Sequence, residues 1–269
     1  CDRYDNSYYP KFKNWCDEYF FLPHRNEARG VGGIFFDYLY NDDWEKDFSF
    51  IKDIGKTFLS SYSKIVKNTV KAINEINSKK RIFFLQISTD QVYSGKGPHK
   101  EKFAKPVNTY GKTKLNGERY IKNINGCILR TNFVGKSLKN DKKSFTDWIF
   151  NSLKNGKTIP VFKNIKFSPL STETLCKYIN LVIKKKIKGI YNLGSKNGMS
   201  KAEFAINFAK KLNLDTKLLK VTNYKKEFLI AKRPLDMRMN VKFFERKFRT
   251  RLKSLNYEIN LISKCYRKY

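Results

Sequence analysis

Along most of the chain, apolar residues alternate between helical spacing and short unbroken runs. Helical spacing is found over Phe48–Phe58 and again over Ile65–Ile76, and the nearly unbroken run Arg81–Ser88 predicts a parallel strand covered on both faces. A loop with glycine and proline then leads into a helix whose first turns carry Tyr110 and Lys114. A second buried strand is predicted at Gly126–Thr131. This order of helices and strands favours a parallel sheet.

The pattern becomes mixed after residue 144 and predicts a smaller α+β region. The expected helices are Phe145–Asn155, Thr172–Lys185 and Lys201–Leu212, and the expected strands are Ile159–Phe162 and Ile190–Leu193. Ser200 and Glu203 have the spacing of a capping box at the start of the last helix. From about Arg249 the sequence is basic and weakly patterned, which predicts a tail without a regular element.

A shift in composition near residues 67–70 divides the chain without a Gly/Ser/Pro linker. Residues 1–67 contain 10 Lys and Arg against 11 Asp and Glu, whereas the remaining residues contain 46 against 13. The helical pattern of Phe48–Phe58 runs almost directly into that of Ile65–Ile76 across this boundary. Two domains normally meet at a polar, flexible stretch, so the direct join is unusual.

The net charge of +32 does not by itself predict a nucleic-acid-binding protein. The basic residues are mostly scattered lysines, and no helix-turn-helix, zinc-finger or RNP-type motif accompanies them. We expect no specific nucleic-acid partner, but a basic surface that attracts anionic ligands, nucleotide phosphates among them.

Other features concern the location of the protein and its cysteines. No run of about 18 apolar residues predicts a membrane span, and the chain opens at Cys1 without a signal region or an initiator Met. A cytoplasmic fragment, or an internal piece of a longer protein, is therefore expected. The five cysteines are isolated from each other and from histidine, which predicts reduced thiols and no metal site.

Candidate chemistry lies in the helix that follows the first predicted strand. Tyr110 and Lys114 are four residues apart, so they share one helix face. An ammonium in that position is expected to lower the pKa of the phenol from its usual value of about 10, toward working pH. Tyr110 then becomes a proton donor to a carbonyl oxygen, and a hydroxyl from Ser88 or Thr89 at the end of the strand can orient that oxygen.

Several motifs in order identify a family that has this chemistry. They are Ile87–Gly95 (ISTDQVYSG), Pro106–Glu118 (PVNTYGKTKLNGE), Leu129–Gly135 (LRTNFVG), Phe167–Pro169, Gly189–Gly194 and Arg233–Pro234. Through these motifs residues of about 68–260 resemble the extended short-chain dehydrogenase/reductases. Within that family the similarity is greatest to sugar-nucleotide reductases of the dTDP-4-dehydrorhamnose reductase type.

The resemblance implies an oxidoreductase that reduces a nucleotide-linked 4-keto sugar with NADPH or NADH. It implies Thr89, Tyr110 and Lys114 as catalytic residues, with Tyr110 and Lys114 also contacting the cofactor. The implied substrate-binding residues are Ser88, Asp90, Gln91, Asn132 and Arg233. Gln91 departs from the aromatic residue that is common after Ser-Thr-Asp in the rhamnose-pathway enzymes, so the sugar itself is left open.

The family's phosphate-binding turn is absent. Those enzymes begin with a strand, a GxxGxxG turn and a helix whose N-terminus meets the pyrophosphate. Gly30–Gly33 does not replace that turn, because it precedes an apolar run instead of following a strand. The predicted fold is α/β: an incomplete Rossmann-like parallel sheet without its first strands and glycine loop, a small α+β C-terminal substrate domain, and an N-terminal α+β fragment.

The first segment resembles a different family. Tyr9–Asp37 (YPKFKNWCDEYFFLPHRNEARGVGGIFFD) and Phe48–Val66 are similar to oxygen-dependent coproporphyrinogen III oxidase of haem biosynthesis. This resemblance implies that His24, Arg25 and Arg29 lie near the tetrapyrrole, and two arginines are chemically suited to bind propionate carboxylates. Roughly a fifth of that enzyme is represented, without its upstream catalytic residues.

The two resemblances divide the chain into four predicted parts. These are a coproporphyrinogen oxidase-like fragment over 1–67, a partial NAD(P)-binding domain over 68–135, a sugar-nucleotide-binding part over 136–260, and a basic tail over 261–269. Three functions stay open: a reductase impaired by the missing loop, a coproporphyrinogen oxidase, or a non-catalytic fusion or assembly artefact.

Overall fold

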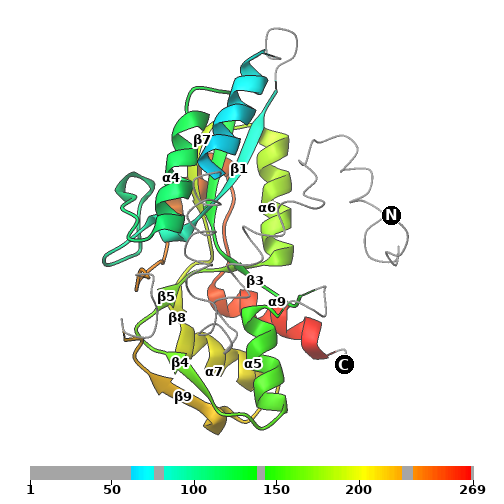
Figure 1. Ribbon diagram of the computed structural model, residues 1–269. Coiled ribbons are helices and arrows are strands. Elements are labelled where there is room, and N and C mark those ends of the chain that lie inside the picture. The colour runs from blue at the N-terminus through cyan, green and yellow to red at the C-terminus, as the bar shows by residue number, and fades with distance from the viewer. Residues whose placement is uncertain (1–61, 76–81, 138–142, 226–232, 268–269) are drawn as a thin grey trace, which may run out of the picture.

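The computed structural model describes residues 62–75, 82–137, 143–225 and 233–267. These residues form an upper part around a parallel sheet and a lower part of helices and short strands (Figure 1). The chain crosses between the two parts more than once, because the third sheet strand comes from residues that follow the first segments of the lower part.

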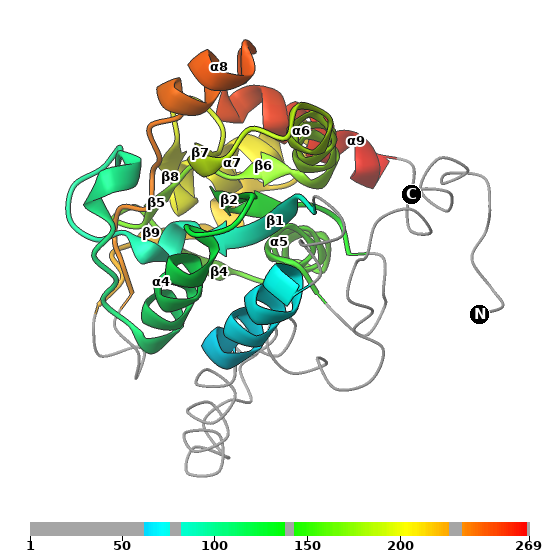
Figure 2. The ribbon, with the colours of Figure 1, turned by 90° about the horizontal axis from the view of Figure 1, so that it is seen from above.

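The sheet has three parallel strands in the order β1-β2-β7. Their bounds are Phe84–Thr89 for β1, Gly126–Thr131 for β2 and Gly189–Leu193 for β7. Residues 62–75, which are helical, and α4 (Thr109–Ile121) cover one face. The other face is covered by α6 (Thr172–Lys185) and α8 (Lys242–Phe248), as Figure 2 shows from above.

Side chains of the central strand alternate between two hydrophobic clusters. Ile128 of β2 packs with Val66, Val70 and Ile121 on the side of helix 62–75 and α4. Its neighbours Cys127 and Leu129 pack on the opposite side, against residues of α6 and α8. A strand covered on both faces needs such a continuous apolar run, and all six residues of β2 are buried.

The lower part has its own hydrophobic core. Its helices are α5 (Phe145–Lys154), α7 (Lys201–Lys211) and α9 (Leu255–Arg267), and its paired strands are β4 (Ile159–Phe162) with β9 (Leu219–Thr222), β5 (Lys166–Phe167) with β8 (Met199–Ser200), and β3 (Phe133–Val134) with β6 (Leu170–Ser171). Single 3-10 turns cover Asp90–Val92, Glu101–Phe103 and Thr216–Leu218. Ile149, Phe204, Phe208 and Ile259 are at the centre of this core.

Most expected elements are present, with three differences. The first strand begins at Phe84, and its side chains through Ile87 are only partly buried, because β1 lies at one edge of the sheet in the described residues. The capping box of Ser200 and Glu203 is confirmed. In place of the expected basic tail, residues through Arg267 form α9, because Leu255, Ile259, Ile262 and Tyr266 recur at helical spacing and are buried. The strand Ile159–Phe162 is confirmed as β4, whereas the other short strands outside the main sheet, and α8, were not expected.

Within the described ranges, no helix is long and apolar enough to cross a membrane.

Candidate active site

The carboxyl end of β1 and the first turns of α4 bring Thr89, Tyr110 and Lys114 together. Thr89 is the last residue of β1, and its side chain is hydrogen-bonded to that of Tyr110. Lys114 follows one helical turn later, with its Nζ 5.9 Å from the centroid of the Tyr110 ring. The three residues predicted to be catalytic are therefore neighbours.

The position of Tyr110 is set by the residues on either side of it. The Asn108 side chain caps α4 by accepting a hydrogen bond from the Gly111 N–H at 2.8 Å, and it donates to Gln91 Oε1 at 3.1 Å. Gly111 allows the start of α4 to lie close to the backbone of Gln91, since a Cβ at position 111 would lie 2.4 Å from the carbonyl oxygen of Gln91. Gln91, an expected substrate contact, thus also holds the start of α4.

The electrostatics of Tyr110 differ from the sequence-based expectation. Its pKa is raised to about 12, first by burial and then by the nearby Asp90, while the hydrogen bond with Thr89 acts in the opposite direction. The expected lowering by Lys114 does not occur. Burial disfavours the phenolate, and the ammonium of Lys114 is instead directed toward the carbonyl oxygen of Ile87, 3.5 Å away.

Lys114 is itself perturbed. Burial lowers its pKa to about 8, and the charge of Glu118, one turn further along α4, partly opposes the change. A buried ammonium loses hydration that only nearby polar or aromatic groups can replace. Lys114 is therefore close to losing its proton at mildly basic pH.

Asp90 and Asn132 lie beside Thr89. Asn132 Nδ2 donates to Asp90 Oδ2 at 2.6 Å, and Thr89 Oγ1 donates to Asp90 Oδ1 at 3.3 Å. Burial raises the pKa of Asp90 to about 6, although both hydrogen bonds act against the shift. Two of the expected substrate contacts thus form a polar pair next to the catalytic trio.

Ser88 belongs to a buried network that the sequence did not reveal. Its hydroxyl donates to Glu118, whose carboxylate is paired with Arg130 of β2 at 2.6 Å. Arg130 also donates to the hydroxyl of Tyr93 at 2.8 Å. Glu118 and Arg130 both stand in motifs quoted for the family resemblance, but only the fold shows that they meet.

Arg233, the remaining expected substrate contact, lies in the lower part of the molecule. Burial raises the pKa of the nearby Tyr224, and the charge of Arg233 acts in the opposite direction. Tyr224 in turn is tied to Asn164 through its backbone, by hydrogen bonds of 2.8 and 3.0 Å.

Tyr62 is a further neighbour of the trio that the sequence did not single out. Lys114 Nζ lies 4.1 Å from the centroid of its ring. The available signal was the helical spacing of Tyr62 with Val66, Val70 and Ile73, which are all buried in the structure.

The residues present fit only part of a nicotinamide site. Tyr110 and Lys114 can form hydrogen bonds with hydroxyl groups of a nucleotide, but no GxxGxxG motif occurs anywhere in the sequence. Outside α4, the nearest glycines along the chain are Gly95 and Gly97 in the loop between β1 and α4, where the N–H of Gly97 donates a hydrogen bond of 3.0 Å to the carboxylate of Asp236. The Gly97 N–H is thus already bound to the Asp236 carboxylate, so it is not available to a pyrophosphate and this loop does not fit one.

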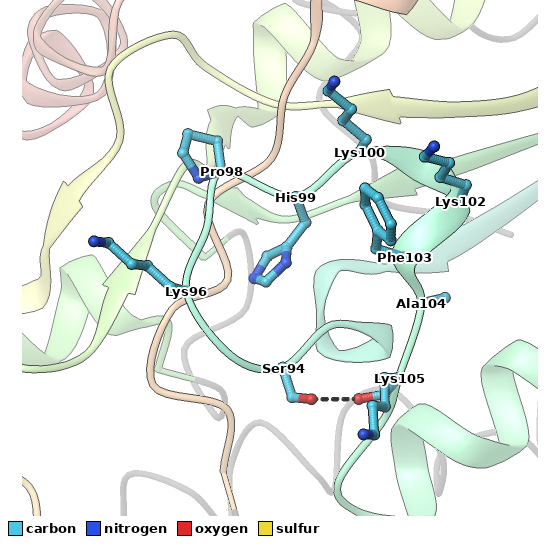
Figure 3. A pocket seen from close by; sticks show the side chains of 9 residues that line it. All are labelled: Ser94, Lys96, Pro98, His99, Lys100, Lys102, Phe103, Ala104 and Lys105. Atoms are coloured by element: carbon cyan, nitrogen blue, oxygen red, sulfur yellow. Dashed lines mark hydrogen bonds between the residues drawn. The ribbon is translucent and has the colours of Figure 1, made fainter.

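The same loop forms a basic hollow of about 610 Å³. Lys96, Lys100, Lys102 and Lys105 line it, together with His99, whose ring is turned inward in Figure 3. His99 stacks on Tyr93 with ring centroids 4.9 Å apart, and its Nε2 lies 2.7 Å from the Asp236 carbonyl oxygen. Its lysines give the hollow a basic lining, and attraction of anionic ligands to it stays a prediction.

The expected porphyrinogen contacts His24, Arg25 and Arg29, and the turn at Gly30–Gly33, lie outside the described residues. Among the residues that are described, no three His, Cys, Asp or Glu side chains form a group able to hold a metal ion.

Comparison with protein families supports both predicted resemblances. The model described as RmlD substrate binding domain matches residues 60–267, and the model described as coproporphyrinogen III oxidase matches residues 1–84. The chain is thus chimeric, and the two matches overlap over residues 60–84.

The curated relatives concern the first segment. An oxygen-dependent coproporphyrinogen-III oxidase of Rickettsia rickettsii (strain Sheila Smith) is 65% identical over 68 residues, which are 25% of this chain and 24% of that protein. The corresponding enzyme of Rickettsia akari (strain Hartford) is 60% identical over 68 residues, with the same coverage. The chain therefore spans about a quarter of the length of these relatives.

Solved structures resemble the remainder. A dTDP-4-dehydrorhamnose reductase from Bacillus anthracis str. Ames in complex with NADP has a TM-score of 0.65 and 20% identity, covering 76% of this chain and 70% of that one. A hypothetical dTDP-4-dehydrorhamnose reductase from Sulfolobus tokodaii has a TM-score of 0.65 and 26% identity, covering 78% and 72%.

A third solved structure is a dTDP-glucose 4,6-dehydratase, DesIV, from Streptomyces venezuelae with NAD and TYD bound. It has a TM-score of 0.63 and 17% identity, covering 80% of this chain and 70% of that one. The predicted α/β class with a Rossmann-like parallel sheet is confirmed by these similarities.

Proposed function

Since the chain belongs to the RmlD substrate binding domain family over residues 60–267, we propose that it derives from an NAD(P)H-dependent reductase of a nucleotide-linked 4-keto sugar. The supporting observation is the assembly of Thr89, Tyr110 and Lys114 at the carboxyl end of a parallel strand. In open α/β sheets, ligands bind outside that end of the strands.

In this proposal Tyr110 donates a proton to the carbonyl oxygen of the sugar. A pKa of about 12 keeps the phenol protonated at neutral pH, which is the form that can donate. The adjacent Thr89 hydroxyl donates a hydrogen bond to the same oxygen and stabilises the charge that develops there. Lys114, which is directed toward the Ile87 carbonyl oxygen and does not lower the pKa of Tyr110, has the proposed role of contacting hydroxyl groups of the cofactor.

Asp90 and Asn132 are proposed to contact the sugar, because their hydrogen-bonded pair adjoins Thr89. Gln91 and Arg233 are proposed as further substrate contacts by family resemblance. The proposed role of Ser88 is indirect, since its hydroxyl is bound to Glu118 inside the fold.

Cofactor binding is proposed to be weak. Tyr110 and Lys114 retain groups suited to a nicotinamide nucleotide, and similar solved structures hold NADP or NAD. The sequence, however, contains no GxxGxxG motif, the pattern whose turn exposes backbone N–H groups to a pyrophosphate at a helix N-terminus. The acid–base part of the reaction is therefore better supported than the supply of hydride.

The test combines binding and turnover with the purified chain. NADPH and NADH binding is followed by nucleotide fluorescence, and reduction of dTDP-4-dehydrorhamnose by loss of absorbance at the nicotinamide band. We expect weak cofactor binding and slow turnover that is abolished in Tyr110→Phe. Lys112→Ala, an exposed position in the same helix, is the matched control and retains the wild-type rate. Failure of both nucleotides to bind at millimolar concentration rules out a reductase.

The first segment favours a second candidate, a coproporphyrinogen oxidase activity, because of its 65% identity over 68 residues to such an enzyme. In this reading His24, Arg25 and Arg29 contact the tetrapyrrole. Quenching of coproporphyrin III fluorescence by the chain tests it, with Arg25→Gln and Arg29→Gln expected to weaken binding through lost propionate contacts. Absence of quenching removes this candidate.

A chain that binds neither nucleotide nor coproporphyrin is the non-catalytic fusion product that forms the third alternative.

A further inference from the structure

Tyr62 occupies one side of the candidate active site. Its ring faces the ammonium of Lys114, with Nζ 4.1 Å from the ring centroid, and its hydroxyl accepts a hydrogen bond from Gln86 Nε2. The hydroxyl is also close enough to Tyr110 and Glu118 for both to act on its pKa, which burial raises strongly. Tyr62 therefore contacts Lys114 and lies within electrostatic range of Tyr110 and Glu118.

Gly117 explains how the tyrosine comes so close. A Cβ at this position would lie 3.0 Å from Tyr62 Cε1 and 3.4 Å from Val66 Cγ2. The absence of a side chain lets helix 62–75 pack directly on α4, one turn after Lys114. Below this contact Val66, Val70 and Ile73 are buried against the sheet, so the helix that carries Tyr62 is held in place.

The ammonium of Lys114 is consequently enclosed on two sides, while Lys114 keeps part of its surface exposed. The ring of Tyr62 lies on one side, and the carbonyl oxygen of Ile87 lies 3.5 Å away. A cation over an aromatic face is attracted to the ring, more strongly where both groups are shielded from water. A ligand whose hydroxyl groups approach Lys114 from the side of Tyr62 has to replace this contact.

We propose that Tyr62 is a gating residue of this site: its ring closes Lys114 to ligands, and a nucleotide carrying ribose hydroxyls reaches the lysine only when the ring is displaced. The identity of that ligand rests on the proposed function, whereas the closure of Lys114 by Tyr62 does not. Tyr62 acts through Lys114 and is not itself a catalytic residue.

The first measurement follows Lys114 without any ligand. The lysines are reductively methylated with ¹³C, and the Lys114 signal, assigned with Lys114→Arg, is titrated by NMR. In Tyr62→Ala the ammonium loses the cation–π contact but regains hydration. Because burial is the main cause of its lowered pKa, the regained hydration is expected to outweigh the lost contact and to move the titration midpoint up from about 8, toward the ordinary 10.5. Tyr62→Phe keeps the ring and is expected to leave the midpoint near that of the wild type. Tyr62→Leu, which preserves apolar packing on Gly117, replaces the alanine variant if that variant does not fold.

The second measurement compares nicotinamide mononucleotide and NADPH affinities of the same variants. Tyr62→Ala is expected to bind about tenfold more tightly than the wild type, since the ligand no longer has to displace a cation–π contact. Tyr62→Phe, which retains the ring, is expected to bind no more than a few-fold more tightly than the wild type.

The outcomes separate the two ideas. If Lys114 titrates identically in the wild type and Tyr62→Ala, or if a nucleotide binds both equally well, the gating role is overturned. If the titration moves but neither nucleotide binds any variant, Tyr62 does close Lys114, and it is the proposed reductase function that fails.

Discussion

Removal of the carboxylate of Glu118 is predicted to destabilise the fold severely. Glu118 and Arg130 have side chains only 2% and 3% exposed, and they are joined by three hydrogen bonds of 2.6 to 3.2 Å. Glu118 also accepts a hydrogen bond from Ser88. Glu118→Gln keeps the size of the side chain but leaves the guanidinium of Arg130 buried without its counter-charge.

The expected loss is about 3–5 kcal/mol, the usual consequence of removing one partner of a buried ion pair. Such a loss is a large share of the roughly 5–15 kcal/mol by which a domain is stable. Urea unfolding followed by circular dichroism at 222 nm measures it as a lower midpoint with an unchanged slope. Glu173→Gln, at an exposed position at the start of α6, is the control and is expected to lose less than about 1 kcal/mol.

A double variant tests whether the charge is responsible. Replacing both partners, in Glu118→Leu with Arg130→Met, removes the unpaired cation, and is expected to be more stable than Glu118→Leu alone by at least about 1 kcal/mol. The reasoning fails if Glu118→Gln loses no more than the Glu173 control, or if the second substitution only adds to the damage of the first.

Two further predictions concern the same edge of the sheet. Asp90 holds its proton in the folded state up to about pH 6 but releases it near 3.8 when unfolded, so stability falls as the pH rises between these values. Asp90→Asn is therefore expected to be more stable than the wild type by about 2–3 kcal/mol above pH 6.5, and equal to it below pH 3.5. Urea unfolding at the two pH values measures this difference. A difference between the two urea midpoints that is the same at both pH values contradicts the prediction. Gly111→Ala is expected to lose about 1–3 kcal/mol, because the new methyl group would lie 2.4 Å from the carbonyl oxygen of Gln91. Thermal unfolding measures that loss, and Lys112→Ala on the exposed face of the same turn is the control, so equal stability of the two variants contradicts the close contact.

The sequence predicted those elements whose signals are local. The strand Gly126–Thr131 and the helix Thr172–Lys185 have the predicted bounds, because an unbroken apolar run and a regular helical spacing each fix their own structure. Helix α9 was missed although its buried residues have helical spacing. Lysine, arginine and asparagine surround them, and only packing against the lower core shows that the apolar residues form one face.

For the candidate site, the sequence predicted which side chains gather but not their electrostatics. The pairing of Tyr110 with Lys114 followed from a four-residue helical spacing, a short-range feature, whereas the choice of Thr89 over Ser88 came from the family resemblance. The raised pKa of Tyr110 depends on burial beneath neighbouring segments, and the orientation of Lys114 depends on Tyr62, 52 residues earlier in the chain. Such long-range contacts have no signal in a single sequence.

The helical residues 62–75 lie within residues 60–84, where the two family matches overlap. The position of the junction between the two families therefore affects which direction each side chain of this helix faces. Each residue advances an α-helix by about 100°. A junction that added or dropped one residue between Tyr62 and Val66 would leave Val66, Val70 and Ile73 seated against the sheet, but would turn Tyr62 away from Lys114. Only a join that preserves the phase of this helix produces the enclosed lysine found here.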